Sequence, residues 1–145
     1  DIADNIGRLY GGPPERVRFR RISAEDLADE APASFDLVIL SDVLHHVPGE
    51  ARSSLLGAVR RLLSAGGVLA FKDWHRNYSP IYWAGWGSDT ILTGDKVAYL
   101  TRTEARELLM HAFGKNSIAD EATIAPWSNN YAFKIVPEPG TARSL

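Results

Sequence analysis

Two short stretches near the middle of this chain carry side chains that can move protons. Asp42 and His45 follow an apolar run that begins at Phe35, and Asp73 follows a second apolar run that begins at Val68. An imidazole titrates near neutral pH, so His45 is a candidate general base that takes a proton from an acceptor hydroxyl. Asp73 is the second candidate catalytic residue, because the ends of the two runs are expected to face the same crevice.

The same side chains are also compatible with other roles. His46 suits the start of a helix better than a catalytic position. Oxygen and nitrogen ligands for a divalent metal ion are offered by Asp42, His45, Asp73 and His75. Their spacing matches no strict metal motif, so we predict no metal centre.

The two apolar runs predict two neighbouring strands with a helix between them. The run from Phe35 to Ser41 is continuous and rich in branched residues, which is typical of a strand buried on both faces. Residues 68–72 form the next strand. Between them, residues 50–63 place their leucines and a valine on one helical face. Ligands of open α/β sheets bind at the carboxyl ends of such strands.

The C-terminal half predicts one capped helix. Thr101 and Glu104 form a capping-box pattern at the start of residues 101–113, and Gly114 follows as a stop signal.

Short strands and one short helix complete the expected elements. Residues 117–124 and 131–136 predict two strands joined by a turn. The alternating residues Val17 to Ile22 predict a strand near the sheet edge, and a short helix is expected around 25–29.

The segments FDLVILSDVLHHV and LLSAGGVLAFKDW, in this order, resemble the second half of class I S-adenosylmethionine-dependent methyltransferases. The resemblance covers residues 1–137 and leaves 138–145 as a flexible tail. It implies an α/β fold: a Rossmann-like, mostly parallel sheet with flanking helices and a C-terminal antiparallel hairpin. It also implies methyl transfer from S-adenosylmethionine to a small-molecule acceptor.

The resemblance implies three groups of cofactor contacts. Asp1 stands where the family's acidic residue binds the ribose hydroxyls. Ser23 and Ala24 stand where the family binds the adenine edge, although the family usually has Asp at the position of Ser23. Ser23 is equally well explained as the N-cap of a helix. The backbone carbonyls that would line the cofactor pocket are those of Ser41, Asp42 and Val43.

The family's glycine-rich G-x-G-x-G loop has no counterpart in this sequence. The resemblance implies that the chain begins after the family's first strand, glycine loop and first helix. We therefore expect the chain alone to bind S-adenosylmethionine weakly or not at all. We also expect the strand at 35–41 to have an open edge that is covered by a second copy of the chain, by the strand at Val17 or by a preceding segment.

Aromatic residues are concentrated after the second strand, within a predicted loop over residues 73–96. Trp74, Tyr78, Tyr82 and Trp83 are the candidate acceptor-binding residues, because aromatic rings provide contact area at a small entropy cost. A satellite core or a dimer surface explains the same density equally well.

Composition narrows the function classes. Apolar residues make up 45% and charged residues 23% of 145 residues, which suits one globular domain. The net charge of −2, without a basic block, argues against nucleic acid as a partner. The absence of cysteine excludes disulfides and thiolate metal sites. We expect a cytoplasmic protein that forms a homo-oligomer or pairs with a preceding N-terminal segment.

Two other functions are alternatives to methyl transfer. A methyltransferase-like module without activity would serve in assembly or binding, which the missing glycine loop favours and the polar cluster at the strand ends disfavours. A fragment of a dinucleotide-binding oxidoreductase shares the fold class but usually lacks the antiparallel hairpin.

Overall fold

The computed structural model describes residues 19–87, 97–125 and 128–139. In chain order the elements are α2 (Ala24–Glu30), β1 (Phe35–Ser41), the 3-10 helix η2 (Leu44–His46), α3 (Gly49–Leu62), β2 (Leu63–Trp74), α4 (Pro80–Gly87), α5 (Arg102–Phe113), β3 (Ile118–Ile124) and β4 (Asn130–Ile135). The predictions for Asp1 and for residues 17 and 18 concern positions outside the described residues.

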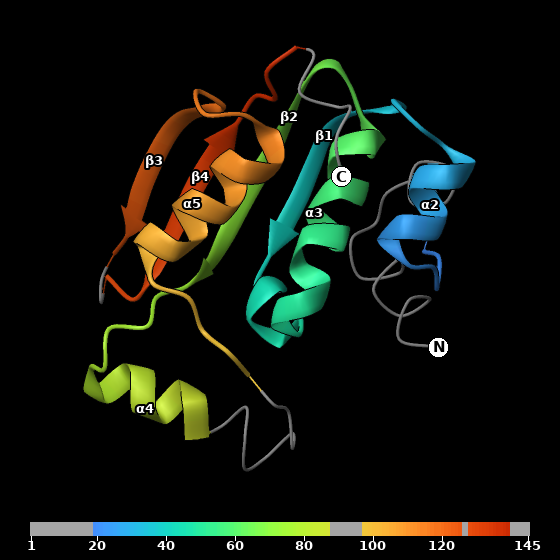
Figure 1. Cartoon of the computed structure of the whole chain (residues 1–145). Helices are drawn as coiled ribbons and strands as arrows, with labels where there is room; N and C mark the ends of the chain where they lie inside the picture. Colours follow the sequence, from blue (N-terminus) through green and yellow to red (C-terminus); the bar gives the residue numbers. More distant parts are fainter. Residues whose placement is uncertain (1–18, 88–96, 126–127, 140–145) are drawn as a thin grey trace, which may run out of the picture.

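The described strands form one mixed sheet in the order β1-β2-β4-β3 (Figure 1). β1 and β2 are parallel, whereas β4 is antiparallel to both of its neighbours. Three strands therefore point the same way, and β4 alone runs against them. The predicted Rossmann-like sheet and its C-terminal antiparallel hairpin are confirmed.

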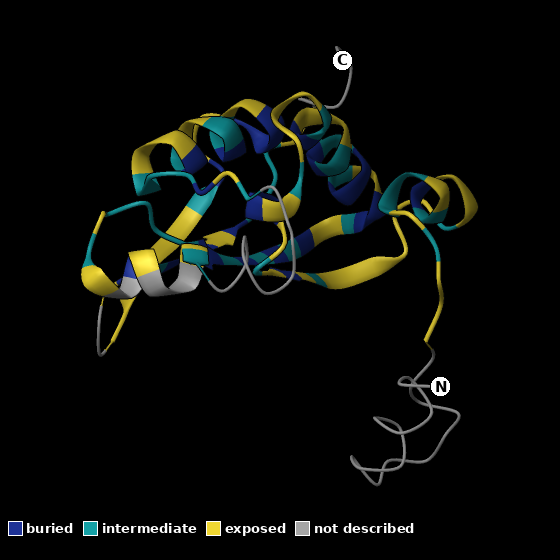
Figure 2. Ribbon diagram, turned by 90° about the horizontal axis from the view of Figure 1, so that it is seen from below, coloured by how far each residue is buried: buried dark blue, intermediate teal, exposed yellow. Residues whose placement is uncertain are grey.

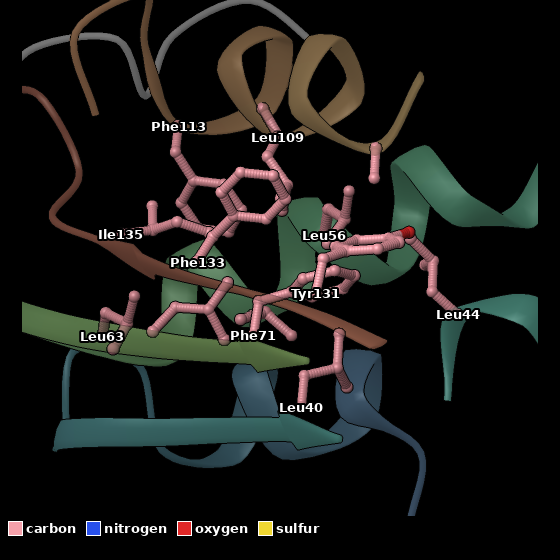
Figure 3. Close-up of a cluster of buried hydrophobic side chains, with 14 residues drawn as sticks. Leu40, Leu44, Leu56, Leu63, Phe71, Leu109, Phe113, Tyr131, Phe133 and Ile135 are labelled. Carbon is pink, nitrogen blue, oxygen red and sulfur yellow. The ribbon is translucent and has the colours of Figure 1, made fainter. Parts of the chain in front are cut away.

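Helices α2, α3 and α5 lie on one side of the sheet, and the core lies between them and the strands (Figure 2). Every second residue of β2 and β4 points into this core, as expected for the two-residue period of a strand. Phe71, Tyr131 and Phe133 are at most 2% exposed and pack beneath Leu56 and Leu109 (Figure 3). This packing fixes the sheet against α3 and α5.

The prediction that β1 is buried on both faces is wrong for the described part of the chain. Leu40 is buried, but Leu37 and Ile39 are 54% and 68% exposed. Alternate residues of a strand point to opposite faces, and only the face beneath α3 is covered by described residues. β1 is also the last strand of the sheet on its side. Its outer edge pairs with no described strand.

Two glycines let β2 begin close against β1. Gly66 has a φ of +79°, and a Cβ at Gly67 would stand 2.9 Å from the carbonyl oxygen of Phe35. The register shifts here, because Phe35 pairs with Leu63 while Leu37 pairs with Val68. The extra residues form a bulge, so β2 begins at Leu63 and not at the predicted Val68.

Three expectations about the other elements need correction. Residues 19–23 are irregular, so the described part of the predicted strand at 17–22 is not a strand. β2 continues through Asp73 and Trp74, because these residues pair with Tyr131 and Asn130 of β4. The predicted loop at 73–96 contains α4, whose proline and aromatic residues gave no helical period for a prediction.

The capped helix is confirmed in α5. Thr101 accepts a hydrogen bond from the Glu104 amide, and the Glu104 carboxylate accepts one from the Thr101 amide. These bonds hold the Glu104 pKa below its usual value, chiefly through the bond with the Thr101 backbone.

The backbone of Glu138 is hydrogen-bonded to the rest of the domain. Its amide donates to the Phe113 carbonyl, and its own carbonyl accepts from Arg60. The expected tail at 138–145 is therefore anchored at its first residue, while 140–145 lie outside the described residues.

We expect Thr101→Ala to lower the free energy of unfolding by about 1 kcal/mol, because it removes the hydroxyl that caps α5. Thr103→Ala is the matched control, since Thr103 is exposed on the same helix. Urea unfolding followed by circular dichroism measures both variants. An equal loss in the two variants would contradict a capping role for Thr101.

Candidate active site

His45 and Asp73 meet at the carboxyl ends of β1 and β2. His45 lies in η2, three residues after the turn that ends β1, and its Nδ1 is hydrogen-bonded to Oδ1 of Asp73. The two side chains are 4% and 2% exposed. Because a carboxylate only accepts hydrogen bonds, Nδ1 donates and Nε2 is left as the proton-accepting nitrogen. The same Asp73 oxygen accepts from the Trp74 amide at 2.8 Å, which fixes the carboxylate.

Tyr99 connects this pair to the aromatic residues. Its ring is stacked on His45, with ring centroids 4.8 Å apart and an interplanar angle of 20°. The rings of Trp74 and Tyr82 also pack near Tyr99, at centroid distances of 6.4 and 5.5 Å. Trp83 packs edge-on against Tyr82 at 5.2 Å. The structure thus brings the predicted aromatic residues next to the predicted catalytic pair.

The aromatic residues differ in exposure. Tyr82 is 7% exposed, whereas Tyr78 and Trp83 are 62% and 52% exposed. Burial raises the pKa of Tyr82, and the neighbouring Tyr78 adds to the increase. Tyr82 therefore serves as an inner packing residue, while the rings of Tyr78 and Trp83 are exposed to solvent. Helix α4 lies beyond the end of β2 (Figure 1).

Arg52 binds two backbone segments near His45, one directly after it in the sequence and one distant in the chain. Its Nε donates to the Val47 carbonyl at 3.0 Å, and its Nη2 donates to the Ala98 carbonyl at 2.6 Å. The Ala98 amide in turn donates to the His45 carbonyl at 2.8 Å. Neither Arg52 nor Tyr99 was predicted from the sequence, because no motif marks them and the contacts of Arg52 with Ala98 and of His45 with Tyr99 join distant segments of the chain.

Tyr131 lies beside Asp73, as its register partner on the neighbouring strand β4. Its hydroxyl is buried without a hydrogen-bond partner among the described residues. Burial raises the pKa of Tyr131 well above its usual value, and the negative charge of Asp73 raises it further. Its ring points towards Leu44 at the start of η2 (Figure 3). Tyr131 therefore supports the site as a neutral ring.

The predicted cofactor residues at the end of β1 lie on an exposed turn. Ser41 and Val43 are exposed, and Asp42 has a φ of +55°. The Asp42 carboxylate is bound by Lys72 at 2.6 and 2.7 Å, and the Val43 carbonyl accepts from the His46 amide at 3.0 Å. A groove of about 350 Å³ begins beside Ser41 and Lys72 and continues over the uncovered face of the sheet.

Ser23 has the N-cap role that its sequence position allowed. Its hydroxyl accepts from the Asp26 amide at 3.1 Å and donates to the Asp26 carboxylate at 2.7 Å. Ala24 is the first residue of α2, which begins at the end of the molecule where β1 ends (Figure 1). A role of this turn in adenine binding stays a prediction.

The four side chains of the alternative metal site have separate partners. Asp42 binds Lys72, and His45 binds Asp73. His75 accepts a hydrogen bond from the Arg102 amide at the start of α5, and burial together with Arg102 and Arg76 lowers its pKa. No group of three metal-binding side chains occurs among the described residues.

A family model described as "Methyltransferase domain" matches residues 2–69. Among curated proteins, a ubiquinone biosynthesis O-methyltransferase of Paracidovorax citrulli is 38% identical over 84 residues, which are 58% of this chain and 34% of the relative. The same-named protein of Pseudomonas syringae pv. tomato is 40% identical over 76 residues, covering 52% and 32% of the two chains. The matched part spans about a third of these relatives.

Solved structures show the same fold at low sequence identity. A 1,6-didemethyltoxoflavin-N1-methyltransferase of Burkholderia thailandensis, solved with S-adenosylhomocysteine, has a TM-score of 0.68 at 18% identity and is aligned over 92% of this chain and 55% of its own. An S-adenosylmethionine-dependent methyltransferase of Mesorhizobium loti has a TM-score of 0.66 at 18% identity, over 90% and 74% of the two chains.

The fold of the described residues agrees with the sequence match in the first half of the chain. No described helix is long and apolar enough to cross a membrane. The sequence match over residues 2–69 and the sheet topology both make this chain similar to S-adenosylmethionine-dependent methyltransferases, whose fold it shares.

Proposed function

We propose that this chain contributes to an enzyme that transfers a methyl group from S-adenosylmethionine to a hydroxyl group of a small aromatic acceptor. The observation that carries the proposal is the buried hydrogen bond between His45 and Asp73 at the carboxyl ends of β1 and β2. The curated relatives are named O-methyltransferases, which supports oxygen as the accepting atom.

The turn after β1 is the proposed cofactor contact. When bound, S-adenosylmethionine supplies a methyl group that its positive sulfur already activates. Because the Asp42 carboxylate is occupied by Lys72, the backbone of Ser41, Asp42 and Val43 is what this turn offers to a ligand. The chain turns at the positive φ of Asp42, and the residues on either side of it, Ser41 and Val43, are exposed.

The start of α2 is the proposed adenine contact. Ala24 is in the first turn of the helix, where amide groups have no partner within the helix. Ser23 keeps acceptor capacity after its two bonds with Asp26. Asp1 is proposed as the ribose ligand and lies outside the described residues.

His45 is the proposed general base. Asp73 holds Nδ1, so the imidazole is oriented and Nε2 is free of that bond. His45 would take the acceptor's hydroxyl proton as the methyl carbon passes from sulfur to oxygen, with the sulfur–carbon bond breaking and S-adenosylhomocysteine leaving, and would later release the proton to solvent. The rest of the rate increase comes from holding the two reactants in line, which needs no further side-chain chemistry.

The aromatic residues after β2 are the proposed acceptor wall. The exposed rings of Tyr78 and Trp83 supply faces on which a planar acceptor stacks, and the buried Tyr82 supports them from beneath. Trp74 and Tyr99 connect this wall to His45. An acceptor bound there would lie beyond the carboxyl end of β2.

The proposal is tested by binding and turnover together. S-adenosylhomocysteine is titrated calorimetrically into the 145-residue chain and into the longest natural protein that contains it. Transfer from labelled S-adenosylmethionine is then measured with a panel of hydroxylated aromatic compounds. Binding without transfer to any hydroxyl would contradict the proposed reaction.

A cytoplasmic location stays a prediction.

We expect Asp73→Asn to lower kcat by about 100-fold, because a neutral amide no longer orients and stabilises the imidazole that receives the proton. The affinity for S-adenosylhomocysteine should stay within about twofold, since Asp73 is buried behind His45. Steady-state kinetics and calorimetry measure these two quantities.

Asp36→Asn is the matched control for Asp73→Asn. Asp36 lies near the start of β1, at the opposite end of the strand from the site, where it binds Ser64. This variant should keep the wild-type kcat. A similar kcat in both variants would remove Asp73 from the catalytic mechanism.

We expect Trp83→Ala to raise the acceptor's KM about tenfold and to leave kcat nearly unchanged, because it removes stacking area that binds the ground state and the transition state alike. Phe19→Ala is the control, since this ring is also half-exposed but precedes α2. An unchanged KM for Trp83→Ala would mean that α4 does not bind the acceptor.

We also propose that the outer edge of β1 pairs with a second copy of the chain, because exposed apolar edge strands readily pair. Ile39→Lys should convert a dimer into a monomer, since a lysine at the edge disfavours pairing. Ile124→Lys, on the opposite edge strand β3, should leave the dimer intact. Sedimentation velocity over a concentration series checks this, and a monomeric wild-type protein would exclude the second copy as the partner.

A further inference from the structure

Arg52 is a buried arginine whose two hydrogen bonds both end on the main chain. It is 7% exposed in the first half of α3 and donates to the carbonyls of Val47 and Ala98. A buried charge costs free energy, and an apolar side chain of similar volume often replaces one without loss of stability. A contribution to stability alone therefore does not account for an arginine at this position.

The two carbonyls belong to the two segments that enclose His45. Val47 directly follows the 3-10 helix that carries His45. Ala98 precedes Tyr99, whose ring is stacked on the imidazole. The Ala98 amide also bonds to the His45 carbonyl, so both backbone groups of Ala98 are held. One guanidinium thus joins the turn that carries the imidazole to the segment that covers its face.

Arg52 also acts electrostatically on Tyr131, the neighbour of Asp73 in the sheet. Its positive charge opposes the rise in the Tyr131 pKa, which burial and Asp73 cause. The guanidinium therefore lies within electrostatic range of the ring that is paired with Asp73 in the sheet.

We propose that Arg52 is a positioning residue, which fixes the His45 turn and the Tyr99 segment relative to each other and thereby sets the orientation of the imidazole against Asp73. The proposal rests on the proposed function only in that the oriented imidazole is the general base. The orientation itself is a property of the protein without any ligand.

The first test measures His45 directly. Long-range ¹H–¹⁵N spectra of histidine-labelled protein report both ring nitrogens of each of the four histidines. Arg52→Met should shift the His45 signals and speed the exchange of its Nδ1 proton, whereas His111 on the exposed side of α5 should not change. Arg52→Lys should give a smaller shift, because one ammonium reaches one of the two carbonyls.

Arg60→Met is the matched control. Arg60 lies on the same helix and also donates to two carbonyls, those of Ala112 and Glu138. Its loss should lower the thermal midpoint and leave the His45 signals in place. If Arg52→Met does not fold, Arg52→Lys and Arg60→Lys provide the same comparison. Unchanged His45 signals in a folded Arg52 variant, or equal changes in the Arg60 variant, would overturn the proposal.

The second test is kinetic. Arg52→Met should lower kcat at least about tenfold, because a small misplacement of a catalytic group is costly, and should leave the Kd of S-adenosylhomocysteine unchanged. Arg52→Lys should recover part of kcat. If the wild-type protein transfers no methyl group to any hydroxyl, the proposed function fails while the spectra still decide the role of Arg52. A loss of cofactor affinity equal to the loss of kcat would contradict positioning.

Discussion

The parallel pairing of β1 with β2 is the contact on which the rest of the site depends. It places Ser41 opposite Lys72, so that both strands end at the same edge of the sheet. The pairing continues one residue further through the bond from the Asp42 amide to the Lys72 carbonyl. Only then does the chain turn, at the positive φ of Asp42, into the short helix that brings His45 onto Asp73.

The site shows how a small domain keeps polar groups in its interior. His45, Asp73 and Arg52 are all buried, and each one has a hydrogen-bond partner. Much of the pairing uses main-chain groups, which have fixed positions and lose no side-chain entropy. Unpaired, these groups would cost free energy on burial, so the network is stable only as a whole. This explains why segments distant in the sequence are held together at one place.

The sheet has one face in a core and one face open among the described residues. Beneath α3 and α5, side chains such as Phe71 and Phe133 are closely packed, whereas Leu37 and Ile39 on the other face are exposed. An apolar strand with an open edge and an open face is unusual for a stable monomer. The same asymmetry places the exposed Ser41 turn next to a groove, where a ligand or another protein segment has room.

The sequence by itself determined the local elements and the edge of the sheet where polar groups gather. Continuous apolar runs predicted β1 and β2, the leucine period predicted α3, and the Thr101–Glu104 pattern predicted α5 with its cap, because each of these signals is local. Only the tertiary structure decided that one face of β1 is exposed, that Asp73 binds His45, and that Arg52 and Tyr99 enclose the imidazole. His45 is separated in the sequence from Asp73 by 28 positions and from Tyr99 by 54 positions. No periodicity or capping pattern specifies which of such distant segments pack together.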